Sequence, residues 1–157
     1  MADAPTQAYP PLDPSHIEGY HAHVYYDAKT KPVAKRLREA IAARFKVYLG
    51  SWHDEPVGPH PTSMYQVAFP VADFAALVPF LMLNREGLSV LVHPVTGEDY
   101  RDHASFPLWL GEPLPLLLPA PHPRLQLGDG DEGVHPHLVV VGAAAEVVHH
   151  AHLVPAA

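Results

Sequence analysis

Six segments with regular hydrophobic periodicity follow one another in the order strand, helix, strand, strand, helix, strand. In the first helix apolar residues recur every four positions, from Val33 through Leu37 to Ile41, as on one face of an amphipathic helix. With right-handed crossovers, this order predicts an α+β ferredoxin-like βαββαβ sandwich, with two helices on one face of a four-stranded antiparallel sheet. We expect strands at 20–26, 46–52, 62–69 and 88–92, a first helix at 32–45, and a second helix that Asp73 caps and that ends at 84–87.

The periodic segments define three regions of the 157-residue chain. Residues 17–118 should form one domain, preceded by a flexible lead of residues 1–16 that is rich in Pro, Ala and Asp. Residues 119–157 form a Pro- and His-rich C-terminal extension, whose histidines we interpret as compositional bias. Residues 1–14 lack the basic start and apolar core of a signal peptide, and no apolar run approaches the roughly 20 residues of a membrane helix. We therefore expect a cytoplasmic protein that does not bind membranes.

The charge and the cysteine content exclude several functional classes. Ten Lys and Arg residues against 17 Asp and Glu residues give a formal net charge of −7, which argues against nucleic acid as a partner. The chain has no cysteine, so disulfides, thiolate metal sites and cysteine nucleophiles are excluded. Thirteen histidines remain as candidate ligands, and imidazole suits zinc, copper, iron and nickel alike.

A His-x-His pair in the first predicted strand indicates a metal site. Side chains alternate along a strand, so His21 and His23 point to the same face. In the predicted topology the first strand lies antiparallel to the fourth, which brings His93 close to His21. The pattern therefore predicts a metal site of His21, His23 and His93 on the open face of the sheet. The alternative is a pair of solvent-exposed histidines on that face.

Several separated motifs resemble the DOPA 4,5-dioxygenase family of small aromatic-ring-opening enzymes. The resemblance covers about residues 17–118 and rests on four segments: Tyr-His-Ala-His-Val-Tyr at 20–25, His-Asp-Glu-Pro-Val-Gly-Pro-His-Pro at 53–61, the segment from Asn-Arg at 84–85 to His-Pro-Val-Thr-Gly at 93–97, and Asp-His at 102–103 with Trp-Leu-Gly at 109–111. It implies O₂-dependent extradiol cleavage of a catechol such as DOPA, with Fe(II) as cofactor and zinc as an alternative in the purified protein. It also implies a soluble homodimer.

The resemblance extends to roles for further residues. A catechol must lose and regain protons, and His53, His60 and His103 are the candidates, since histidine titrates near neutral pH. Arg85 and Arg101 could bind the carboxylate of DOPA, although either could be an ordinary surface charge.

Two questions stay open from the sequence. Non-haem iron sites often combine two histidines with one carboxylate, so Asp99 or Asp102 could be a ligand in place of His21. His60 could also replace His21, because its proline-bounded loop could fold over the open face of the sheet. The fold also suits a non-catalytic dimeric module that binds a metal or another ligand, because ferredoxin-like sheets serve many functions. A zinc-dependent hydrolase or lyase is a third alternative.

Overall fold

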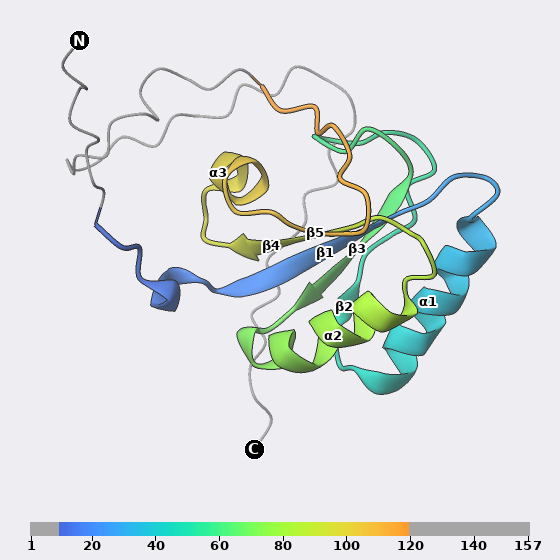
Figure 1. Ribbon diagram of the computed structural model, residues 1–157, viewed down its shortest axis with the longest axis horizontal. Helices are drawn as coiled ribbons and strands as arrows, with labels where there is room; N and C mark the ends of the chain where they lie inside the picture. Colours follow the sequence, from blue (N-terminus) through green and yellow to red (C-terminus); the bar gives the residue numbers. More distant parts are fainter. Residues whose placement is uncertain (1–9, 120–157) are drawn as a thin grey trace, which may run out of the picture. The chain divides into compact units, whose positions relative to one another are not determined.

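The computed structural model describes residues 10–119 (Figure 1). These residues belong to one compact unit, Met1–Ala120. Residues 1–9 of the predicted lead, and all of the predicted extension after Pro119, lie outside the described residues. Within the described part, no helix has the length and apolar character needed to cross a membrane.

The described chain forms one five-stranded sheet and three α-helices (Figure 1). The strand order is β2-β3-β1-β4-β5, and every neighbouring pair is antiparallel. The strands are β1 Gly19–Tyr25, β2 Tyr48–Leu49, β3 Met64–Phe69, β4 Val90–Val95 and β5 Leu108–Leu110; the helices are α1 Lys31–Arg44, α2 Phe74–Asn84 and α3 Asp99–Ala104, with 3₁₀ turns at Pro14–His16 and Val71–Asp73.

The prediction of an α+β fold with an antiparallel sheet is confirmed, but the prediction of four strands is wrong. The fifth strand, β5, pairs with β4 through Leu108, Trp109 and Leu110. A segment of three residues is too short for its hydrophobic pattern to distinguish a strand from a helix, which is why sequence analysis missed it. The predicted 46–52 strand is also shorter than expected, because only Tyr48 and Leu49 pair with β3.

Strand β4 continues through Pro94 to Val95, three residues beyond the predicted end at 92. Proline lacks the N–H that a central strand needs for its ladder. Here Pro94 faces Tyr20 of β1 on one side, while β5 pairs only with residues 90–92 on the other. Pro94 therefore lies where β4 has become an edge strand on the β5 side, and the missing N–H costs little there.

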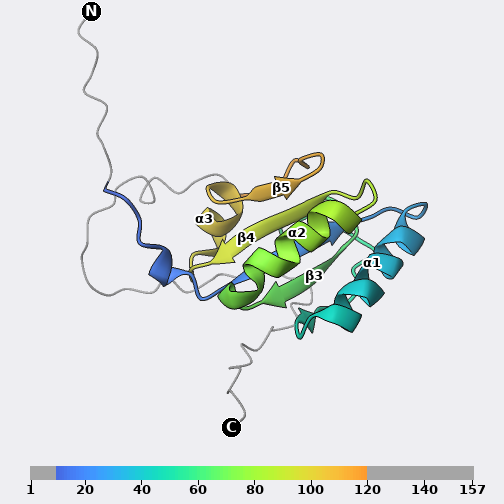
Figure 2. The same cartoon turned by 60° about the horizontal axis from the view of Figure 1, so that its bottom comes forward.

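The two faces of the sheet are covered by different elements. Helices α1 and α2 cover one face (Figure 2), and their Leu37, Ile41, Leu77 and Leu81 pack against Val24 and the neighbouring sheet residues. Helix α3 lies on the other side of the sheet (Figure 1). That second face carries the smaller apolar cluster and, from β1, the alternate side chains that include the histidines.

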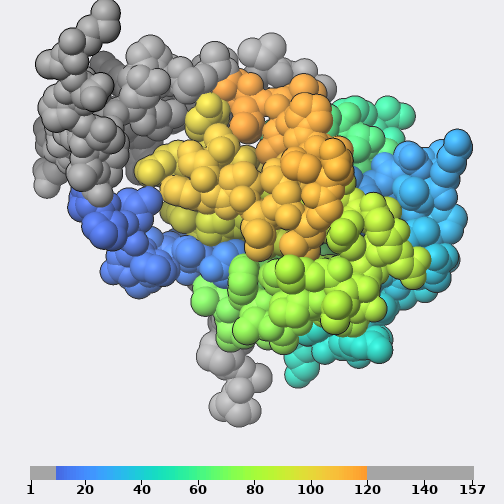
Figure 3. Space-filling view, viewed as in Figure 1, coloured from blue at the N-terminus to red at the C-terminus, as the bar shows by residue number. Residues whose placement is uncertain are grey.

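The chain after β5 lies against the loop at residues 53–61 (Figure 3). Leu114 and Leu116 pack against the cluster of Tyr25, Met64 and Leu91. The Leu117 N–H then donates to the Pro59 carbonyl at 2.8 Å. This segment therefore covers part of the second face and holds the loop that carries His60.

The turn after β5 depends on Gly111. Its φ is +80°, a left-handed conformation, and a Cβ there would collide with the guanidinium of Arg85. That guanidinium donates to the Leu88 carbonyl at 3.1 Å, so Arg85 joins the approach to β4 with the end of β5.

A left-handed conformation costs an L-residue about 1–2 kcal/mol. We predict that Gly111→Ala lowers the free energy of unfolding by more than this amount. Gly87→Ala is the matched control, because Gly87 has φ +83° but no atom within 4 Å of an added Cβ. Denaturant unfolding of both variants measures the difference. Equal losses would contradict a packing role for Arg85 at this turn.

Candidate functional site

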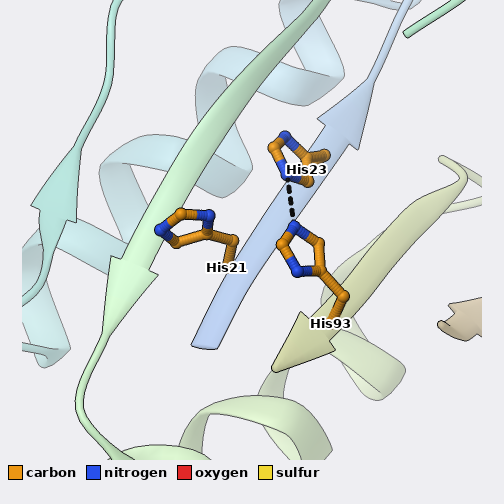
Figure 4. A group of neighbouring side chains, drawn as sticks. All are labelled: His21, His23 and His93. Atoms are coloured by element: carbon orange, nitrogen blue, oxygen red, sulfur yellow. Dashed lines mark hydrogen bonds between the residues drawn. The ribbon is translucent and has the colours of Figure 1, made fainter. Parts of the chain in front are cut away.

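Strands β1 and β4 bring three histidines together on the second face. Their register places His21 directly opposite His93, which confirms the neighbourhood that the topology predicted. His23 is 2% exposed and His93 is 3% exposed, whereas His21 is half-buried. Figure 4 shows one nitrogen of His23 facing one nitrogen of His93, with the His21 ring beside them and extending away from His93.

Two further histidines join them from other elements. His60, at the end of the 53–61 loop, is buried, and its ring centroid lies 4.1 Å from that of His23. His103 of α3 lies 4.0 Å from the ring of His93. We call these five residues the histidine cluster: His21, His23, His60, His93 and His103.

The cluster contains two groups whose ligand nitrogens all lie within 4.8 Å of one another. One is His21, His23 and His93, the predicted metal site. The other is His23, His60 and His103. Both groups consist of nitrogen donors, and His23 belongs to both.

Hydrogen bonds orient several of the rings. Nδ1 of His93 lies 2.8 Å from the Pro94 carbonyl, and Nδ1 of His103 lies 2.8 Å from the Asp99 carbonyl. A carbonyl can only accept, so in each neutral ring Nδ1 carries the hydrogen and Nε2 keeps its lone pair. Metal-binding histidines have this same arrangement.

Burial keeps the histidines neutral. It lowers the pKa of His60 to about 3 and that of His93 to about 4, and repulsion from His103 acts in the same direction. Burial, followed by the charges of His60 and His93, also holds the pKa of His23 well below its usual range. At neutral pH these imidazoles are therefore uncharged, which is the form that binds a metal ion.

The cluster fits a divalent transition metal. Nε2 of His23 and Nε2 of His93 lie 3.1 Å apart. Two nitrogens bound to one ion at about 2.0–2.1 Å lie roughly 2.8–3.4 Å apart when the angle at the ion is about 90–110°. Nδ1 of His23 and Nε2 of His103 are buried without a hydrogen-bond partner among the described residues, which an ion would explain.

The two candidate carboxylates lie outside both groups. Asp102 is 1% exposed, and its oxygens accept hydrogen bonds from the Thr96 N–H at 2.9 Å and the Thr96 hydroxyl at 2.6 Å. It therefore closes the turn between β4 and α3 and positions His103. The Asp99 side chain is exposed, and its backbone carbonyl serves His103.

Three other predicted site residues, His53, Arg85 and Arg101, belong to neither group of histidines. His53 is half-buried near His60, and its carbonyl accepts from the Tyr26 hydroxyl at 3.0 Å. Arg85 makes the contacts at Gly111 described above. Arg101 lies two residues before His103 on α3, which places it on the opposite side of that helix. It pairs with Glu98 at 3.3 Å and lines a cavity of about 330 Å³.

Tyr25 contacts the histidine cluster through His60, although it was not among the residues predicted for the site. Its hydroxyl lies 2.7 Å from Nδ1 of His60, and its ring stacks on Trp109 with centroids 5.8 Å apart. Burial raises the pKa of Tyr25, so it stays a neutral phenol. The signal was the strand period, since Tyr25 shares a face with His21 and His23.

The part of the chain that contains the histidine cluster matches a known protein family. The Dopa 4,5-dioxygenase family matches residues 20–120, which include all five histidines. A DOPA 4,5-dioxygenase from Amanita muscaria is 35% identical over 133 residues, which cover 73% of this chain and 58% of that protein. An uncharacterised 21.2 kDa protein from Botryotinia fuckeliana is 39% identical over 120 residues, covering 69% of this chain and 66% of the relative. The chain therefore spans less than two thirds of either relative.

A solved structure resembles the fold closely. The crystal structure of a candidate dioxygenase from Nostoc punctiforme matches with a TM-score of 0.68 and 56% sequence identity. The match covers 68% of this chain and 93% of the Nostoc protein.

We predict that the metal-free protein loses stability as the pH falls below about 6.5. The unfolded histidines titrate near 6.5, whereas folded His93 and His60 titrate at about 4 and about 3. Between those values the unfolded chain binds protons that the folded chain does not, so stability that is complete above pH 6.5 is lost progressively. Each residue should contribute a loss of about 2 kcal/mol between pH 7 and pH 5.

Urea unfolding in the presence of a chelator at the two pH values measures this loss. His60→Gln should remove its share of the pH dependence. His16→Gln, at an exposed position outside the cluster, should leave it unchanged. A free energy of unfolding that does not vary across this range would contradict the buried, neutral state of the cluster.

Proposed function

The chain belongs to the Dopa 4,5-dioxygenase family, and from this membership we propose that it is a non-haem, Fe(II)-dependent extradiol dioxygenase that opens the ring of a catechol such as DOPA with O₂. The family and its relatives indicate an oxygenase. The observation that carries the finer proposal is the buried, neutral, nitrogen-only histidine cluster on the second face. We further propose that the enzyme acts as a cytoplasmic homodimer.

In this proposal His21, His23 and His93 hold the iron, and zinc is the alternative ion. Bound Fe(II) would supply a Lewis acid for the catechol oxygens and one-electron chemistry for O₂. The chain keeps the ligand nitrogens available by burial and by the bond from His93 to the Pro94 carbonyl. Leu91, Trp109 and the segment after β5 keep the second face apolar beside the cluster.

Proton transfer is assigned to histidines around that group. His60 is neutral at pH 7, and when its Nδ1–H donates to Tyr25, its Nε2 can accept the proton of a catechol hydroxyl. The same nitrogen can return the proton to the product. His103 and His53 are the other candidates, and only His103 of these two belongs to the cluster, with its ring 4.0 Å from that of His93.

Of the two arginines proposed to bind a substrate carboxylate, Arg101 has the more suitable surroundings. It lines a cavity, where it pairs with Glu98 at 3.3 Å, whereas the Arg85 guanidinium donates to the Leu88 carbonyl beside Gly111. The remaining partners in the proposal are the catechol and O₂, with no role for nucleic acid given the net charge of −7.

Protein purified without oxygen and loaded with Fe(II) should consume O₂ when DOPA or caffeic acid is added under air. The ring-opened product should develop visible absorbance at the same rate. An oxygen electrode and a spectrophotometer measure both signals. Tight metal binding without O₂ uptake across a panel of catechols would instead indicate a non-catalytic binding module. Turnover without O₂ would indicate a hydrolase or lyase.

We predict that His23→Ala loses both bound iron and turnover, and that His93→Ala loses turnover, because each removes a buried ligand nitrogen. Removal of a partner that only orients a ligand lowers metal affinity or activity by about 10–100-fold. The loss of activity in these variants should be larger, because the ligand itself is removed. Metal content and O₂ uptake are measured on the same samples. The control is Leu83→Ala, at an exposed position on α2 outside the cluster. A variant of His23 or His93 with full activity would remove that residue from the site.

A further inference from the structure

We propose that the histidine cluster contains a second position for the metal ion, formed by His23, His60 and His103. It shares His23 with the His21, His23 and His93 position, and one ion occupies either position in exchange. This inference rests on the proposed metal dependence and adds a second ligand set. Its ligand class is a divalent first-row metal that prefers imidazole, such as Fe(II), Co(II) or Zn(II).

Three separate elements build the second position. His23 comes from β1, His60 from the 53–61 loop and His103 from α3, and their ligand nitrogens lie within 4.8 Å of one another. The Leu117 to Pro59 hydrogen bond fixes the loop, and the Asp102 to Thr96 hydrogen bonds fix the start of α3. The convergence is therefore held by structure outside the cluster.

Unpartnered buried nitrogens point to an ion at this position. Among the described residues, buried side-chain nitrogen or oxygen atoms without a partner occur at His23 Nδ1, His103 Nε2 and Arg38 Nη1. The Arg38 guanidinium lies over the rings of Trp52 and Tyr65, and these contacts explain why its Nη1 is buried without a hydrogen bond. The two histidines both belong to the second position. Buried polar atoms rarely lack a partner, so two of them in one ligand group call for an ion.

The rings of the second position are also prepared for an ion. The Asp99 carbonyl takes the Nδ1 hydrogen of His103 and leaves its Nε2 with a lone pair. The Tyr25 hydroxyl lies 2.7 Å from Nδ1 of His60 and can take that hydrogen in the same way. Tyr25 is therefore a positioning residue, which acts on the ion through His60.

Sharing of His23 explains why the positions exchange. Two ions on one imidazole require both of its nitrogens to be deprotonated, which a neutral ring does not provide. A single ion in the first position leaves His60 and His103 for proton transfer, whereas an ion in the second leaves His93 for that work. The location of the ion thus decides which histidine carries protons.

Cobalt titration of the metal-free protein without oxygen tests the proposal, with calorimetry for affinity and absorption for the ligand set. His21→Gln and His103→Gln should each retain binding of one ion, because one position stays complete. The double variant His21→Gln/His103→Gln should lose more than about 100-fold in affinity, since neither position is complete. His23→Gln alone should lose as much. The matched double variant His21→Gln/His53→Gln should retain binding.

Tyr25→Phe supplies a second readout that does not depend on removing a ligand. In the His21→Gln background it should weaken cobalt binding by about 10–100-fold, as loss of an orienting partner does. In the His103→Gln background it should have no effect. Tyr65→Phe is the control, because Tyr65 is also buried and its hydroxyl binds the Ala34 carbonyl away from the cluster.

Two results would overturn the proposal in variants whose circular dichroism matches the parent. One is loss of cobalt binding in His21→Gln alone, and the other is retention of binding in His21→Gln/His103→Gln. The proposed enzymatic function fails separately. Wild-type protein that binds metal at both positions but consumes no O₂ with any catechol would leave the second position standing and remove the dioxygenase.

Discussion

The register between β1 and β4 is the constraint on which the site depends. His21 pairs with His93, and Ala22 with Val92, so one face receives the histidines while the other receives the apolar core. A slip of one residue would exchange those faces. Burial of Val24, Val90 and Val92 under α1 and α2 fixes this register. It therefore holds the histidines on the opposite face of the sheet.

The second face buries several ionisable side chains, which is unusual for a protein interior. The buried polar residues of the described chain are His23, His60, His93 and Asp102, and all four lie at or beside the cluster. Burying an imidazolium is costly, which is why the pKa values of these histidines fall and the rings stay neutral. The physical arrangement that lowers stability in acid is the same arrangement that offers lone pairs to a cation.

Loops outside the sheet complete the site because other contacts restrain them. The 53–61 loop is held at one side by Pro59, which accepts from Leu117, and at the other by Asp54, which binds Lys31 and the Tyr26 hydroxyl. Asp102 restrains the turn before His103 in the same manner. His60 and His103 thus reach β1 from two separate segments of the sequence, with their orientation already set.

The sequence alone determined the face shared by His21 and His23, the presence of His93 beside them, and the family. These follow from the two-residue period of a strand, from the βαββαβ order and from local motifs. Only the tertiary structure decided that His60 and His103 share His23, that Asp102 binds Thr96, and that β5 extends the sheet. Those outcomes depend on where loops and short segments turn in space. Side-chain periodicity carries no information about such turns, because they are set by contacts between residues far apart in the chain.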